Sequence, residues 1–287
     1  MASLRDIRRR IASIKNTQQI TKAMKMVAAA KMKKAQDAIL SARPYAKKMH
    51  MVLSSLAART GEEAHPLLKV RDEERVGIIV LTSDRGLCGG FNTAICRQAL
   101  QFLKAHKEKQ NQVVFHVIGK KGRNFFKSRD ISIDKIYTDL SGKVQYKDAS
   151  EIAGDMVGQF EKEELDVIYM IYNEFKSAIS QKVIVERLLP VEPLKTTGEM
   201  NAVEYLYEPS EKEVLSRILP QYVDTQVYRA FLESEASEQG ARMTAMESAT
   251  NNARDMIRLL TLNMNKARQS QITKEISEIV GGAEALK

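Results

Sequence analysis

Hydrophobic residues in the first sixty positions recur at alternating steps of three and four. This spacing places them on one narrow face of a helix for about seven heptads, which is typical of a coiled-coil strand. The stripe consists of Leu4, Ile7, Ile11, Ile14, Ala28, Met32, Ala35, Ile39, Ala42, Ala46, Met49, Leu53 and Leu56. Pro44 lies inside the stripe and predicts a local bend near Arg43, whereas Gly61 and Pro66 predict the end of the helix.

A second stripe of the same period lies in the last part of the chain, from about Ser210 onward. Pro209 and Pro220 suit a first helical turn, so a helix is predicted to begin there, in one or two pieces. The stripe consists of Met246, Ala249, Ala253, Met256, Leu260 and Ala267, and polar Asn263 interrupts it. A third set, Ile272, Ile276, Ile279, Ala283 and Leu286, is offset from the second. Such an offset redirects a supercoil, so it predicts a change of environment at this point.

Between the stripes, short apolar runs alternate with amphipathic stretches. The runs at 76–81, 113–118, 166–172 and 182–188 predict strands, and a smaller strand is predicted near 204–207. The stretches at 93–106, 122–128 and 149–161 predict helices. This βαβα order predicts a mostly parallel sheet with flanking helices, that is, a Rossmann-like α/β domain.

The predicted fold class is therefore mixed α+β and α/β, with three segments. An N-terminal helix (1–59) and a C-terminal helix (209–287) form a long antiparallel coiled coil, and the α/β domain (70–208) lies between them in the sequence. The two helices most simply pair with each other, because each apolar seam has to be buried. If residue 58 lies level with residue 210, the last twenty or so residues project alone. Their apolar stripe then predicts a partner protein, unless the helix docks on its own α/β domain.

Charge is concentrated at the start of the chain. The net charge is +9, yet residues 1–59 alone carry +12. A basic helix of this kind predicts an acidic partner, which could be nucleic acid, anionic lipid or a protein surface, or else a solvated face. Within its stripe the polar residues Gln18, Thr21 and Lys25 either specify the helix register or contact an external partner.

The remaining side chains offer little chemistry. Cys88 and Cys96 indicate reduced thiols in a cytosolic compartment, and the four histidines have no metal-ligand spacing. We therefore expect no metal and no cofactor. The longest apolar run, 76–81, is far shorter than the roughly 18 residues that cross a bilayer. We expect membrane association only through partners.

Four motifs carry a resemblance to a known family. They are Asn16–Ala29 (NTQQITKAMKMVAA), Ser83–Asn92 (SDRGLCGGFN), Ser237–Met246 (SEQGARMTAM) and Lys266–Ile276, which contains KARQ and ITKEI. The chain resembles the gamma subunit of F-type ATP synthases along its whole length. The resemblance implies the central rotor stalk of a proton-translocating enzyme, with no catalytic site of its own. It also implies as partners the hexamer of alpha and beta subunits, the epsilon subunit and the ring of c subunits, with no nucleic acid. Because no transit peptide is evident, we expect a bacterial member at the cytoplasmic face of the cell membrane.

The resemblance further implies roles for individual residues. Met24 and Lys25 are expected to face an acidic segment of the beta subunit, and Arg268 and Gln269 to meet a beta-subunit loop. Thr273 and Glu275 lie just beyond, and Arg242 is expected to support this coupling region. An apolar tip that turns inside an apolar sleeve is implied for Ile272, Ile276, Ile279 and Leu286.

Parts of the sequence also suggest two other functions. Gly86, Gly89 and Gly90 follow a predicted strand as in a nucleotide-binding turn, but they lack the G-x-G-x-x-G order, and Asp84 would face the phosphate. The basic helix could contact nucleic acid as a zipper-type basic region does. However, its apolar stripe runs through the basic stretch, which a groove-binding region would not require.

Overall fold

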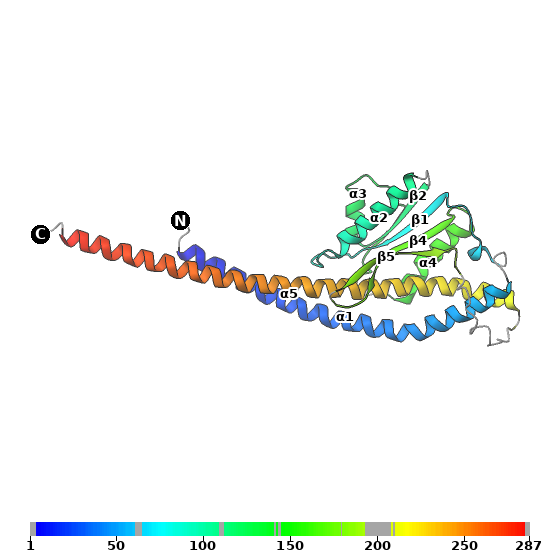
Figure 1. Ribbon diagram of the computed structural model, residues 1–287, viewed down its shortest axis with the longest axis horizontal. Coiled ribbons are helices and arrows are strands. Elements are labelled where there is room, and N and C mark those ends of the chain that lie inside the picture. Colours follow the sequence, from blue (N-terminus) through cyan, green and yellow to red (C-terminus); the bar gives the residue numbers. More distant parts are fainter. Residues whose placement is uncertain are drawn as a thin grey trace. The chain divides into compact units, whose positions relative to one another are not determined.

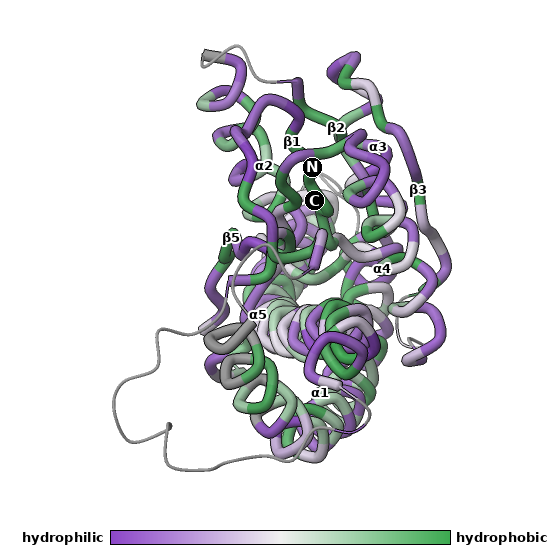
Figure 2. Tube along the Cα trace, turned by 90° about the vertical axis from the view of Figure 1, so that its right-hand side faces the viewer, coloured by the Kyte–Doolittle hydropathy of each residue, from purple (hydrophilic) through white to green (hydrophobic). Residues whose placement is uncertain are grey.

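The computed structural model describes residues 4–60, 65–108, 112–140, 142, 145–178, 180–192, 208 and 210–284. The chain forms two compact units. The helical unit comprises Met1–Val27 with Met243–Lys287, and the sheet unit comprises Ala28–Arg242. Two long helices, α1 (Leu4–Thr60) and α5 (Glu211–Glu284), each contribute to both units. Figure 2 shows hydrophobic and hydrophilic residues alternating along their turns, as expected of helices with one apolar stripe.

The sheet unit is built on five strands in the order β3-β2-β1-β4-β5. They are β1 (Arg75–Leu81), β2 (Gln112–Ile118), β3 (Lys135–Tyr137), β4 (Val167–Phe175) and β5 (Gln181–Leu189). β1 to β4 run parallel, and β5 pairs antiparallel with β4 (Figure 1). The connections contain the helices α2 (Phe91–Glu108), α3 (Lys120–Lys127) and α4 (Tyr146–Glu161), and a short 3-10 turn, η2 (Pro66–Leu68), precedes β1.

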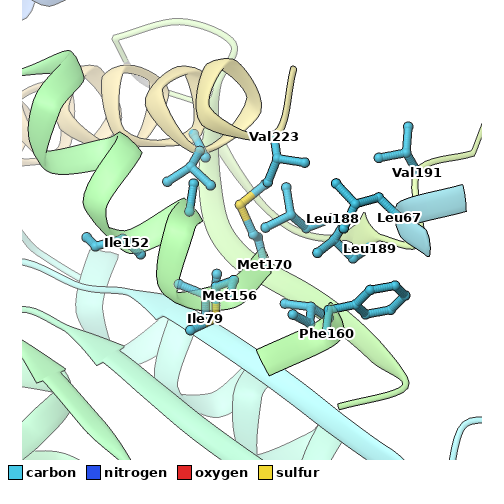
Figure 3. Close-up of a cluster of buried hydrophobic side chains, with 14 of the residues drawn as sticks. Leu67, Ile79, Ile152, Met156, Phe160, Met170, Leu188, Leu189, Val191 and Val223 are labelled. Carbon is cyan, nitrogen blue, oxygen red and sulfur yellow. The ribbon is translucent and has the colours of Figure 1, made fainter. Parts of the chain in front are cut away.

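Helices cover both faces of this sheet, and successive side chains of each strand point to opposite faces. Each strand therefore contributes to two cores. On β1, Val76, Ile78 and Val80 pack in a core with residues of α2 and α3. Ile79 and Leu81 pack on the opposite face, in a core with α4, α5 and α1. Figure 3 shows part of that second core, where Met156, Met170, Leu188 and Val223 meet from four elements.

The two long helices run antiparallel within each unit. In the sheet unit, Leu53 and Leu56 of α1 share a core with Leu215 and Leu219 of α5, and Ala35 and Ile39 share one with Leu232 and Ala236. In the helical unit, Lys25 contacts Glu247 and Thr21 contacts Thr250. Residue numbers rise along one helix as they fall along the other, as the sequence predicted.

Most predicted elements are confirmed within one or two residues, and two points differ, namely β3 and Met256. β3 was not predicted, and the strand expected near 204–207 lies outside the described residues. Both helices continue through their prolines, Pro44 and Pro220, so of the two alternatives left open for the last helix the structure has the single piece. Met256 is exposed, and its neighbour Ile257 is half-buried at this step of the stripe; the other predicted members, Met246, Ala249, Ala253, Leu260 and Ala267, are buried or half-buried. That part of the prediction was wrong because two neighbouring apolar residues, Met256 and Ile257, fit the spacing almost equally well.

Candidate coupling surface

The basic part of α1 meets α5 through polar contacts in the helical unit. The Nζ of Lys25 lies 2.7 Å from Oε1 of Glu247, and both side chains are partly exposed. The Thr21 hydroxyl is buried and lies 2.8 Å from the Thr250 hydroxyl. Thr21 therefore acts within the seam, as the register interpretation requires. Lys25 has a partner on its own chain, but an ammonium group has three donors and can bind a second acid.

Exposed side chains mark the surface near Lys25. Met24 is half-buried, whereas Met26 and Val27 are 60% and 57% exposed. Both are apolar side chains that the described part of the chain leaves in water, next to a lysine at the seam. An apolar surface beside a fixed positive charge suits a partner that carries both apolar and acidic groups.

The second predicted group lies on the last turns of α5. Arg268, Gln269, Thr273 and Glu275 are all exposed. Their contacts are local to the helix: the Thr273 hydroxyl donates to the Gln269 carbonyl oxygen at 3.0 Å, and Glu275 accepts from Gln271 at 3.0 Å. These side chains are therefore presented on the surface of the helical unit rather than used in its packing.

An apolar stripe runs along the same turns. Ile272, Ile276 and Ile279 follow one another at steps of four and three, so they share one face of α5. They are 48%, 56% and 72% exposed, and Val280 beside them is also exposed. The remaining predicted member, Leu286, lies outside the described residues. Burying one aliphatic side chain is worth roughly 1.5–3 kcal/mol, so this stripe would gain several kcal/mol from an apolar partner.

Arg242 belongs to the sheet unit, where it is a structural tie. Its Nη2 donates to Oε1 of Glu238 at 2.6 Å and to the Gly86 carbonyl oxygen at 3.3 Å, and its Nη1 donates to Gln239 at 3.0 Å. The Arg242 and Glu238 side chains are only 11% and 7% exposed. Burial raises the pKa of Glu238, and the Arg242 charge opposes that shift. Arg242 thus links α5 to the loop that follows β1.

That loop, the SDRGLCGGFN motif, is held by its own side chains. The Ser83 hydroxyl donates to the Arg85 carbonyl oxygen at 2.6 Å, and the Asn92 amide oxygen accepts from the Ser83 backbone N–H at 2.9 Å. Leu87 lies at the tip with a φ of +64° and is 63% exposed. Sequence reasoning did not assign Asn92 a role.

The geometry disfavours a nucleotide at this loop. Oδ1 of Asp84 accepts a hydrogen bond from the Lys120 backbone N–H at 3.1 Å, at the start of α3. A helix N-terminus is where a phosphate would bind, and here a carboxylate already occupies a donor.

Burial raises the pKa of Cys88, and it raises the pKa of Cys96 to about 11, so neither thiol forms a reactive thiolate at neutral pH.

Two sets of residues were missed at the sequence level. Glu247 contacts Lys25, and Thr250 contacts Thr21. Aligning the two antiparallel helices residue by residue could have identified both partners. Glu238 stands one turn before Arg242, which is a visible ion-pair spacing on a helix.

The described residues contain no cluster of three or more histidine, cysteine or acidic side chains arranged to hold a metal ion. None of their helices combines the length and the apolar character that a membrane crossing demands.

Comparison with known proteins identifies the family. The model of a family described as ATP synthase matches residues 3–286. The ATP synthase gamma chain of Pelotomaculum thermopropionicum is 51% identical over 287 residues, and that of Anaeromyxobacter sp. (strain K) is 50% identical over 290 residues. Both alignments cover 100% of each chain. This chain belongs to the ATP synthase gamma chain family, which confirms the resemblance seen in its motifs.

Solved structures share the fold. A chain from the central stalk and c-ring of the Tetrahymena thermophila mitochondrial ATP synthase is 27% identical, with a TM-score of 0.61, and covers 80% of this chain and 99% of its own. A chain from the Euglena gracilis mitochondrial enzyme, in a structure of OSCP, F1 and c-ring, is 19% identical, with a TM-score of 0.67. The alignment with the Euglena gracilis chain covers 99% of this chain and 94% of that chain. The similarity of fold therefore extends over nearly the whole chain.

Proposed function

We propose that this chain is the central rotor stalk of a proton-translocating ATP synthase. In this role it transmits torque between the ring of c subunits and the hexamer of alpha and beta subunits, and it has no catalytic site of its own. One observation carries the proposal: α5 continues as a single helix to Glu284, and its last turns present an apolar stripe that the described residues leave uncovered. Covering such a stripe with an apolar protein surface would be favourable.

Torque transmission follows from asymmetry. A pair of helices has no threefold symmetry, so inside a ring of three catalytic sites it presents a different surface to each. A partner whose conformations bind these surfaces with different free energies shifts its population accordingly. Rotation of the stalk then moves each site through the same series of conformations in turn.

The residues divide this work by their chemistry. Met24 and Lys25 would meet an acidic segment of the beta subunit, and Arg268 and Gln269 a beta-subunit loop, with Thr273 and Glu275 beside them. Ile272, Ile276 and Ile279, with Leu286, would turn inside an apolar sleeve, since apolar contacts lack the directionality of hydrogen bonds. Arg242 would act indirectly, by holding the loop that contains Gly86 against α5.

The same proposal places the protein among its partners. The epsilon subunit and the c-ring would join the stalk at the membrane, and the chain would be a peripheral component at the cytoplasmic face of a bacterial cell membrane. Two properties support a protein partner over nucleic acid: the register runs unbroken through the basic stretch, and Lys25 is engaged by Glu247 on the same chain.

A truncation tests the proposal. A chain that ends after Lys266 is expected to fold, because residues 268–283 are all exposed in the structure. It should co-purify poorly with alpha and beta subunits, and reconstituted membrane vesicles should show weakened ATP-driven proton pumping. Lys274→Ala is the matched control, since its pair with Glu278 spans 3.5 Å on the exposed surface of the same turns. Full coupling by the truncated chain would contradict the role of the tip.

A further inference from the structure

A cavity lies between α1 and α5 within the sheet unit. Its volume is about 480 Å³, and side chains of α1, α5 and β5 line it. This size falls in the range of roughly 300–1,000 Å³ that is usual for small-molecule sites. A second cavity of about 550 Å³ shares Ala42, Thr225 and Tyr228 with the first. Together they form one hollow section of the seam.

The seam is hollow here because of its residue sizes. The wall formed by α1 includes Ala42 and Ala46, two small residues one turn apart. Toward the start of α1, Ile39 packs against Leu232 and closes the seam. Toward its end, Leu53 packs in the core that contains Leu219. Larger side chains therefore close the seam on both sides of a section where alanines leave space.

One carboxylate that lines the cavity has an oxygen without a hydrogen-bond partner in the described part of the chain, although the Phe175 backbone and the Arg229 charge both stabilise the group. Arg229 is engaged with Glu186, whose Oε1 lies 2.5 Å from its Nη2, and Glu186 also accepts from the Tyr172 hydroxyl at 2.6 Å. Glu233 stands one turn after Arg229 and lines the same cavity. Among the described residues, its Oε2 has no hydrogen-bond partner. Burial raises the pKa of Glu233, which means that the fold does not fully compensate this charge.

The lining favours a cation over an anion. Across the two adjoining cavities the lining has three carboxylates, those of Glu186, Glu233 and Asp224, and two guanidinium groups, those of Arg43 and Arg229, so carboxylates are in excess by one. The adjoining cavity adds Asp224, another carboxylate whose pKa burial raises. Tyr222 and Tyr228 contribute aromatic rings, which attract cations at their faces and pack against apolar groups.

We propose that this cavity is a binding site for a small organic cation with an apolar body, such as an aryl-alkyl amine. The ammonium group would lie at Glu233, and the apolar body would pack against Ala42, Ala46 and Tyr228. The proposal is independent of the rotor function, because it rests only on the residues between Ile39 and Glu233. A bound cation would contact both long helices at once.

Calorimetric titration of the full chain tests this site with three probes of one shape: 4-phenylbutylamine, 4-phenylbutanol and 4-phenylbutanoate. Saturable binding of the amine is expected at one site, at least tenfold tighter than that of the alcohol or the carboxylate. Glu233→Gln should weaken amine binding roughly tenfold, which is the factor for one charge-assisted hydrogen bond. Ala42→Phe should abolish it by filling the cavity.

Glu235→Gln is the matched control. Glu235 stands on the same helix, and burial raises its pKa as it does that of Glu233, but it lines a different and much smaller cavity. This variant should bind the amine as the unchanged chain does. Melting temperatures of the three variants identify any that fail to fold, and the charge substitution and the cavity-filling substitution test the site separately. Absence of saturable amine binding, equal binding of all three probes, or equal losses with Glu233→Gln and Glu235→Gln would overturn the proposal.

Discussion

Replacing Arg242 by methionine should destabilise the sheet unit by about 3–5 kcal/mol, the usual cost of removing one partner of a buried ion pair. The Arg242 and Glu238 side chains are both nearly enclosed, at 11% and 7% exposure, so water cannot compensate the carboxylate that remains. Methionine keeps most of the aliphatic volume. The variant also removes the donor to the Gly86 carbonyl oxygen, which weakens the tie between α5 and the loop after β1.

The assay is urea unfolding, with the free energy extrapolated to water, of the two single variants and the double variant. Because the double variant Arg242→Met, Glu238→Gln carries neither charge of the pair, it should be more stable than Arg242→Met alone, and the cycle gives the coupling between the two side chains. Arg254→Met is the control, since Arg254 is exposed on the same helix and donates a hydrogen bond to Asn251, three residues earlier. It should change stability by no more than about 0.5 kcal/mol.

The pH dependence gives a second check with a defined sign. Burial already raises the pKa of Glu238 above its ordinary value, and loss of the Arg242 charge raises it further. The folded variant then binds a proton more readily than the unfolded chain, so its stability penalty should shrink as the pH falls through the raised pKa. A penalty below about 1 kcal/mol at neutral pH, or an equal penalty in the Glu238→Gln background, would refute this reasoning.

Three further predictions concern separate parts of the molecule. Lys25→Glu should reduce the coupling of proton flow to ATP synthesis more than it lowers the melting temperature. The reason is that the exposed ion pair of Lys25 with Glu247 contributes at most about 1 kcal/mol to stability. An effect on the melting temperature alone would contradict the contact of Lys25 with a partner. Desolvation lowers the pKa of buried His116, so stability should fall as the pH drops below about 6.5, and His116→Leu should flatten that fall in thermal melts. Gly119→Ala should cost several kcal/mol in urea unfolding, on the order of 2–4, because φ is +93° and the new Cβ would overlap the Thr82 carbonyl oxygen; near-wild-type stability would show that the backbone can shift.

The sequence predicted the long helices and the βαβα order because both depend on hydrophobic periodicity, which is a local signal. It missed β3, whose three residues Lys135–Tyr137 form a short edge strand with no apolar run. It also assigned Met256 to the buried stripe. The structure places Ile257 there, and it adds Thr250, whose hydroxyl shares a hydrogen bond with the Thr21 hydroxyl across the paired helices.

The candidate site likewise has a part that the sequence predicted and a part that only the folded structure shows. The residue types of the coupling surface followed from family motifs, and the exposure of Ile272, Ile276 and Ile279 agrees with the expectation of an uncovered stripe. Their roles toward other subunits remain predictions. The tie from Arg242 to Gly86 spans 156 positions of the sequence, so it depends on how β1 and α5 pack and could not be seen in any local pattern.

The hydroxyl pair of Thr21 and Thr250 has a mechanical consequence. Interdigitated aliphatic side chains hold the helices together, and two hydroxyl oxygens at 2.8 Å add a directional contact that fits one register. A displacement of α1 along α5 by one turn, about 5.4 Å, would break their hydrogen bond at a cost of roughly 0.5–1.5 kcal/mol. The pair therefore acts as a latch against slippage, so that a twisting load applied to one helix is shared by its neighbour.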